Sequence, residues 1–135
     1  MTTVLDGPAA VYAAVGSELD PTDWVTIGAE QVADYRASTG DDAEGVPPYL
    51  VLALSNLFMP QMVRFDGFSS GVNAGVDEVR FPAAVPVGAR LRGRGTLVSA
   101  AEVKGSVQTL IRITIELDGS DEPACVIDSL SRWFP

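Results

Sequence analysis

The stretch VPPYLVLALSNLFMPQM, residues 46–62, decides the fold of this chain. Two prolines stand near its start, where a helix tolerates them because its first N–H groups have no partner within the helix. If residues 47–62 form a helix, their leucines, valine, phenylalanine and methionines leave almost no polar face. A helix of this kind must be enclosed by other elements of the protein.

Four strand-like runs follow this stretch. Each is strongly apolar or alternates with period two, and the turn sequences PAAVPVG, KG and GSDEP separate them. The runs are residues 71–81, 89–103, 106–119 and 124–134. A buried helix followed by long antiparallel strands predicts an α+β protein in which a curved sheet wraps a long central helix. This arrangement is the hotdog fold.

The residues before the central helix predict shorter elements. Pro8 in a first turn and Gly16 as a stop indicate a short N-terminal helix. We expect Thr26 to cap a second helix that runs to about Ser38 and ends at Gly40. With 135 residues, no linker and no internal repeat, the sequence predicts one domain over the whole chain.

Composition excludes several classes of function. The formal net charge is −9, so we expect neither nucleic acid nor an anionic membrane as a partner. No apolar run reaches the roughly 20 residues of a membrane span, and no signal sequence precedes the N-terminal helix, which predicts a cytoplasmic protein. The chain has no histidine and one cysteine, Cys125, in an apolar run. We therefore expect Cys125 to pack in the core, and we expect no metal and no cofactor.

Several phrases resemble those of one family: DWVTI, ASTGDD, PYLVLALSNLFMPQM, VDEVRFPAAVPVGARLRG and PACVIDSLSRW. Together they are similar to the MaoC-like dehydratases, the R-specific enoyl-CoA hydratase branch of the hotdog superfamily, from about Asp23 onward. The resemblance implies a homodimer with a continuous sheet and an acyl-thioester tunnel at the subunit interface. It also implies addition of water to a trans-2-enoyl thioester, or its removal to form one.

The same resemblance implies where the chemistry lies. Family members hold a water with an Asp and a His in a D-x-x-x-x-H loop, and a glycine N–H at the start of the central helix polarises the thioester carbonyl. These positions fall on Asp41, Val46 and the pair Pro47 and Pro48. Valine carries no titratable proton and proline has no N–H. Loss of a general base removes ~10²–10⁴ in rate and loss of an oxyanion donor ~10²–10³, so we expect ordinary enoyl-CoA hydration to be weak or absent.

The candidate site residues surround this shortened loop. Asp41 and Asp42 are the candidate catalytic residues, although Asp42 fits a solvated turn equally well. The candidate substrate-binding residues are Glu44, Val46, Pro48, Tyr49 and Asn73.

Some candidates have a plain structural alternative. Glu44 fits an exposed surface, Tyr49 fits a packing role, and Asn73 fits the outside of a strand. The alternating Arg90, Arg92 and Arg94 could meet a CoA or carrier-protein phosphate, but a solvated sheet face is the safer expectation.

Three functions are compatible with these residues. The favoured one is a divergent enzyme that takes a bulky acyl or polyketide-like substrate, tethered to CoA or to a carrier protein. It would perform dehydration, isomerisation or cyclisation through Asp41 and its carboxylate neighbours. The second is a catalytically silent subunit that pairs with an active paralogue, and the third is a module that binds an acyl ligand without turnover.

Overall fold

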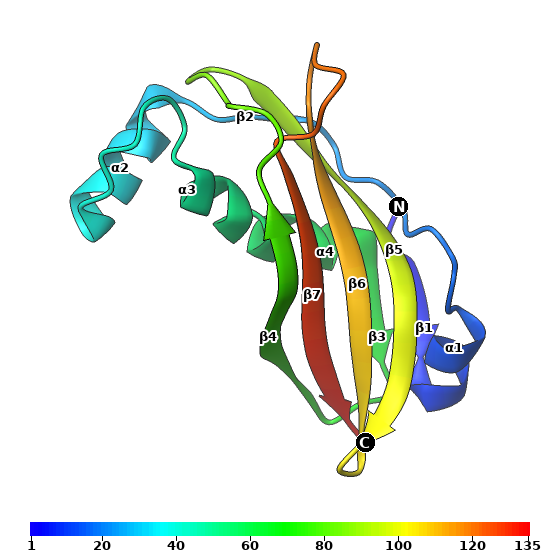
Figure 1. Ribbon diagram of the computed structural model, residues 1–135. Helices are drawn as coiled ribbons and strands as arrows, with labels where there is room; N and C mark the ends of the chain where they lie inside the picture. Colours follow the sequence, from blue (N-terminus) through cyan, green and yellow to red (C-terminus); the bar gives the residue numbers. More distant parts are fainter.

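The computed structural model describes residues 1–135 (Figure 1). Its elements, in chain order, are β1 Thr3–Asp6, α1 Gly7–Ala13, β2 Val25–Thr26, α2 Ala29–Thr39, α3 Pro48–Ala53, α4 Ser55–Met62, β3 Val63–Asp66, β4 Ser70–Arg80, β5 Arg90–Val103, β6 Ser106–Leu117 and β7 Cys125–Phe134. Five strands form an antiparallel sheet in the order β2-β5-β6-β7-β4. The four long strands match the four predicted runs to within two residues at each end.

The central helix consists of two consecutive segments, α3 and α4; in Figure 1, α4 passes behind the strands of the curved sheet and α3 extends beyond the edge strand β4. Leu54 joins them with helical backbone angles, and its N–H donates to the carbonyls of Leu50 and Val51. Helical hydrogen bonding resumes directly, because Phe58 N–H donates to Leu54 O at 2.9 Å. The predicted fold, a central helix wrapped by a curved antiparallel sheet, is confirmed.

The core lies between this helix and the concave face of the sheet. Phe58 and Met62 of α4 are fully buried. They meet side chains that alternate along the strands, as period-two patterning requires. The fully buried side chains of the sheet include Leu91, Leu97, Ile111, Ile113, Ile115 and Ile127.

Two features near the N-terminus differ from the prediction. Thr26 does not cap the second helix; it lies in β2, paired with Arg90, and the N-cap of α2 is Gly28. The strands β1 and β3 form a separate parallel pair, with Thr3 opposite Val63, which the sequence patterns did not indicate. Pairing with a neighbouring strand has replaced the local capping preference at Thr26.

One side of the fold is uncovered. The edge strand β4 pairs only with β7, and its Val72 and Val76 are 49% and 50% exposed. On the central helix, Leu57 is 47% exposed. One chain therefore does not enclose its central helix completely. No helix is both long enough and apolar enough to span a bilayer.

Candidate functional site

The loop between α2 and α3 holds Asp41 in a defined position. Gly40 ends α2 in the left-handed conformation, with φ of 74°, which turns the chain sharply. Asp41 N–H then donates to Thr39 Oγ1 at 3.2 Å, and Asp41 Oδ1 accepts from Ala43 N–H at 3.0 Å. The second carboxylate oxygen, Oδ2, accepts from the hydroxyl of Tyr35 at 3.4 Å. Asp41 is thus a half-buried carboxylate with one oxygen engaged by its own loop and the other facing a phenol.

Arg36 of α2 ties down the rest of this loop. Its Nη2 donates to Ala43 O at 2.7 Å and to Gly45 O at 2.8 Å. The loop then joins the body of the protein, because Val46 N–H donates to Val85 O at 2.8 Å. Gly45 has a φ of 72°, and a Cβ there would stand 2.7 Å from Val85 O, so this position requires glycine.

The loop forms one wall of an open cavity of about 670 Å³. Asp41, Asp42 and Glu44 line it together with Arg36 and Val87. Asp42 and Glu44 are exposed, whereas Asp41 is partly buried. The structure therefore brings the three predicted carboxylates to one hollow, beside the guanidinium that holds their loop.

A second, smaller pocket lies at the end of the loop and the start of the central helix. Glu44, Val46 and Pro48 line a small pocket of about 60 Å³. Val46 is only 3% exposed and belongs to the core. Tyr49 is 67% exposed, and its ring centroid lies 6.2 Å from that of Phe81. Tyr49 therefore lies at the surface against another aromatic ring, and it lines neither of these two hollows.

Asn73 lies in a different hollow. Its Oδ1 accepts from Gly75 N–H at 3.0 Å, at an irregularity of β4. It lines a groove of about 520 Å³ between α4 and the strands β4 and β7, with Met59 and Trp133 among its neighbours. Asp41 does not line this groove, so Asn73 and Asp41 do not form one site within a single chain.

Sequence reasoning missed two residues that shape the site, Tyr35 and Arg36. The ring of Tyr35 is partly buried and packs against the core. Partial burial raises the pKa of its hydroxyl, and the adjacent Asp41 carboxylate raises that pKa further. The available signal was their position in the last turn of α2, directly before the loop that carries Asp41.

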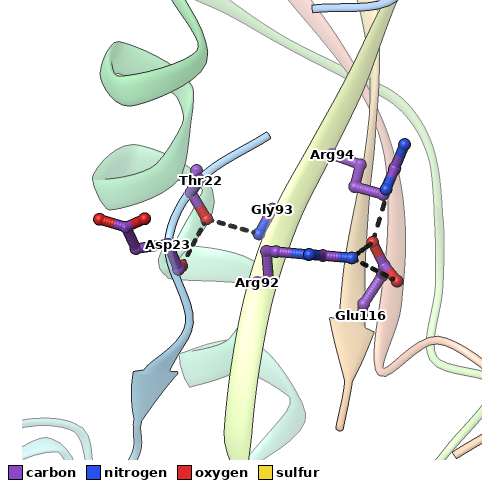
Figure 2. A network of polar contacts seen from close by, with 6 residues as sticks. All are labelled: Thr22, Asp23, Arg92, Gly93, Arg94 and Glu116. Carbon is purple, nitrogen blue, oxygen red and sulfur yellow. Dashed lines mark hydrogen bonds and ion pairs between the residues drawn. The ribbon is translucent and has the colours of Figure 1, made fainter. Parts of the chain in front are cut away.

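On the outer face of the sheet, Arg92 is held by its neighbours (Figure 2). Its Nη2 donates to both carboxylate oxygens of Glu116, at 3.1 and 3.3 Å, and Arg94 Nε lies 3.5 Å from the same carboxylate. The Arg92 guanidinium also lies 4.5 Å from the centre of the Trp24 ring. Arg90 pairs with Asp118 at 3.2 Å. These arginines are paired rather than simply solvated.

The same figure shows how the segment before α2 is fastened to β5. Gly93 N–H donates to Thr22 Oγ1 at 2.9 Å, and that hydroxyl donates to Asp23 O at 2.8 Å.

No group of three His, Cys, Asp or Glu side chains in the chain is arranged to hold a metal ion. Cys125 is fully buried in β7.

Comparison with solved structures supports the fold. The chain superposes on a monoamine oxidase regulatory protein from Archaeoglobus with a TM-score of 0.74 and 14% identity, covering 90% of this chain and 91% of that one. A MaoC-like dehydratase from Rhodospirillum rubrum gives a TM-score of 0.68 at 13% identity, with 90% and 92% covered. A 3R-hydroxyacyl-ACP dehydratase complex from Mycobacterium tuberculosis gives 0.66 at 19% identity, with 89% and 96% covered.

Sequence relatives are more similar. No family model matches the chain. The chain is 28% identical to a nodulation protein N from Rhizobium meliloti, over 84% of this chain and 83% of that protein. It is 35% identical to a 3-hydroxyacyl-thioester dehydratase Z from Mycobacterium tuberculosis, over 93% of this chain and 94% of the relative. Since this identity extends over nearly the full length of both chains, and the fold agrees, the protein belongs to the MaoC-like hotdog family.

Proposed function

We propose that the protein is a dehydratase-type lyase that acts on an acyl thioester, with Asp41 as its principal catalytic carboxylate. The observation that carries this proposal is the setting of Asp41, which is half-buried, fixed by its own loop and placed on the wall of an open cavity. The dehydratases among the relatives support the reaction class.

The finer part of the proposal concerns the substrate. Val46 stands where a family histidine is expected, and its side chain is 3% exposed, so it offers no proton to a substrate. Pro47 and Pro48 provide no N–H at the start of the central helix. We expect the site to rely on Asp41 and on orientation of the substrate, which by itself can supply several kcal/mol. The short loop and open cavity favour a bulky acyl or polyketide-like group, tethered to CoA or to a carrier protein.

The proposed active form is a homodimer. Val72 and Val76 on the edge strand, and Leu57 on the central helix, leave apolar surface uncovered around the groove that contains Asn73. A second copy paired along β4 would cover these side chains and satisfy the unpaired edge. It would also bring a second subunit's surface to that groove.

The proposal is tested by turnover. The purified protein would be incubated with 3-hydroxyacyl-CoA and enoyl-CoA thioesters of increasing chain bulk, and formation or loss of the enoyl absorbance followed. We expect slow turnover of crotonyl-CoA and faster turnover of bulkier thioesters. Asp41→Asn should lower the rate by ~10²-fold or more, as loss of a positioned general base does.

Asp121→Asn is the matched control, because Asp121 is an exposed carboxylate of the loop before β7. It should leave the rate unchanged. A folded Asp41→Asn variant with the wild-type rate on a thioester that the protein turns over would contradict the catalytic role of Asp41.

A second candidate is a catalytically silent subunit, favoured by the absence of histidine and by the uncovered β4 edge. Light scattering after size exclusion distinguishes the two. A stable species of twice the 14.2 kDa chain mass, formed by this chain alone, supports the homodimeric enzyme. A monomer that dimerises only when a histidine-containing paralogue is added supports the silent subunit.

A further inference from the structure

We propose that Tyr35 is the proton donor that works with Asp41, so that a tyrosine on α2 supplies the second acid–base group of a chain without histidine. This inference rests on the proposed dehydratase function and deepens it by assigning a second catalytic residue.

The geometry singles out this pair. Asp41 Oδ1 is engaged by the N–H of Ala43, which leaves Oδ2 as the oxygen available for chemistry. The Tyr35 hydroxyl, 3.4 Å away, is the side-chain group that hydrogen-bonds to Oδ2. A contact of this length is long for an O–H···O bond, and catalytic hydrogen bonds commonly tighten only when substrate is bound.

The backbone beneath Tyr35 is held firmly. Ser38 Oγ and Thr39 Oγ1 both donate to Tyr35 O, at 3.0 and 2.7 Å. Thr39 Oγ1 also accepts from Asp41 N–H at 3.2 Å. One hydroxyl therefore links the main chains of Tyr35 and Asp41, which fixes the two functional side chains relative to each other.

The groups around the pair keep Tyr35 protonated. Its hydroxyl faces Asp41 and lies near Tyr49, while Arg36, Asp42 and Glu44 border the cavity next to Asp41. Partial burial and the adjacent carboxylate both raise the pKa of Tyr35 above its usual value. The phenol stays protonated at neutral pH and can give its proton to a leaving oxygen. Arg36 is engaged with the carbonyls of Ala43 and Gly45 and remains outside this transfer.

The dehydration step balances with these two groups alone. Asp41 accepts the proton on C2 of a 3-hydroxyacyl thioester, and the C–H electron pair forms the C2–C3 double bond. The C3–O bond breaks, and the leaving oxygen takes the phenol proton of Tyr35 and departs as water. The Tyr35 phenolate then recovers a proton from the Asp41 carboxylic acid across their contact, which restores both groups.

The first test removes one hydroxyl. Tyr35→Phe keeps the ring that packs against the core, and Tyr12→Phe is the matched control, since Tyr12 is an exposed tyrosine of α1. The probe is 3-hydroxyoctanoyl-CoA, or the bulkiest thioester that the wild-type protein turns over. We expect kcat to fall by ~10²–10⁴-fold in Tyr35→Phe, at an unchanged melting temperature, and to stay constant in Tyr12→Phe. A Tyr35→Phe variant with the wild-type kcat would overturn the inference.

The second test does not need turnover. Tyrosinate absorbance is followed as the pH is raised, and the difference between the wild-type protein and Tyr35→Phe gives the titration of Tyr35. The same difference is then measured between Asp41→Asn and the double variant that carries both Asp41→Asn and Tyr35→Phe. We expect the pKa of Tyr35 to fall toward its ordinary value when Asp41 loses its charge. An unchanged pKa would overturn the inference even if the protein is active. If no acyl thioester is turned over, the proposed function fails, whereas a shifted pKa would still support the coupled pair.

Discussion

Phe58 of α4 packs directly onto Gly93 of β5. A Cβ atom at residue 93 would stand 2.8 Å from Phe58 Cβ and 3.0 Å from Phe58 Cγ, although Gly93 has an ordinary strand conformation. Phe58 is fully buried. Because residue 93 of β5 has no side chain, the central helix can lie this close to the sheet.

Gly93→Ala should accordingly destabilise the protein. The added methyl group has to displace the base of a buried ring, and overpacking of this kind costs ~1–3 kcal/mol. Gly95→Ala is the matched control, because its Cβ would meet only the flexible ends of Leu19 and Met62, at 3.2 and 3.3 Å. Urea unfolding should show the larger loss for Gly93→Ala, and equal losses would contradict the close packing at Phe58.

The pair of Arg112 and Asp128 predicts a pH-dependent stability. Arg112 Nε and Nη2 donate to the two carboxylate oxygens of Asp128, at 2.8 and 3.1 Å. This hydrogen bonding lowers the pKa of Asp128 below its usual value, although burial of the carboxylate by itself would raise that pKa. The ion pair therefore makes its full contribution to the free energy of unfolding above the unfolded pKa of about 3.9. This contribution is lost as the pH falls through the lower folded pKa.

Arg112→Met should cost ~1–3 kcal/mol at neutral pH, because it leaves the Asp128 carboxylate without its partner. The difference from the wild type should shrink near pH 3, because Asp128 of the unfolded chain is increasingly protonated there and the stabilisation by the ion pair decreases. Arg94→Met is the control, since Arg94 is about half exposed and its Nε lies 3.5 Å from Glu116, so its effect should stay within about 0.5 kcal/mol. Urea titrations at both pH values measure these quantities, and a constant Arg112→Met effect would contradict the assignment.

Arg36→Met should loosen the loop that carries Asp41. The substitution removes donors to the carbonyls of Ala43 and Gly45 while keeping most of the side-chain volume. Amide hydrogen exchange at residues 42–46 should accelerate, with a loss of unfolding free energy of ~1–2 kcal/mol. Arg64→Met, which breaks an exposed ion pair with Asp66, should leave that exchange unchanged. Unchanged exchange in Arg36→Met would show that the loop does not need its arginine.

Cys125 should be inert in the folded protein. It is fully buried, and burial raises the pKa of its thiol to about 11, so almost no thiolate is present at pH 8. Reaction with a disulfide reagent should therefore follow unfolding, and Cys125→Ala should abolish it. Because the thiol ionises more readily in the unfolded chain, stability should decline as the pH rises from about 9 to about 11. Rapid modification under native conditions would contradict this placement.

The sequence predicted the sheet and the central helix well because both depend on repetitive patterns. Strand alternation identified β4 to β7, and the apolar stretch with its prolines identified α3 and α4. Thr26 was misassigned because its capping preference is local, whereas its actual pairing with Arg90 is set by a strand far along the chain. The parallel partner of β1 was missed for the same reason, since four residues carry too little pattern.

The candidate site was predictable only in part. The family resemblance placed Asp41, and the adjacent Asp42 and Glu44 do share its cavity. The contact between Tyr35 and Asp41 depends on the reversal at Gly40, which joins residues six apart across the end of a helix. No regular helical spacing indicates such a pair. The separation of Asn73 from this loop likewise depends on the strand order, which periodicity does not specify.

That strand order has a consequence for biosynthesis. Residues 125–134 form β7, which lies between β6 and β4, so β4 has no hydrogen-bonded neighbour in the sheet until β7 arrives. During translation, β4 and the apolar central helix emerge from the ribosome well before the strand that connects them to the rest of the sheet. The nascent chain must therefore keep an unpaired strand and an uncovered helix from associating with other chains until its last strand is made. Holding-type chaperones would act during that interval, on apolar side chains of the central helix such as Phe58 and Met62, which the finished protein buries.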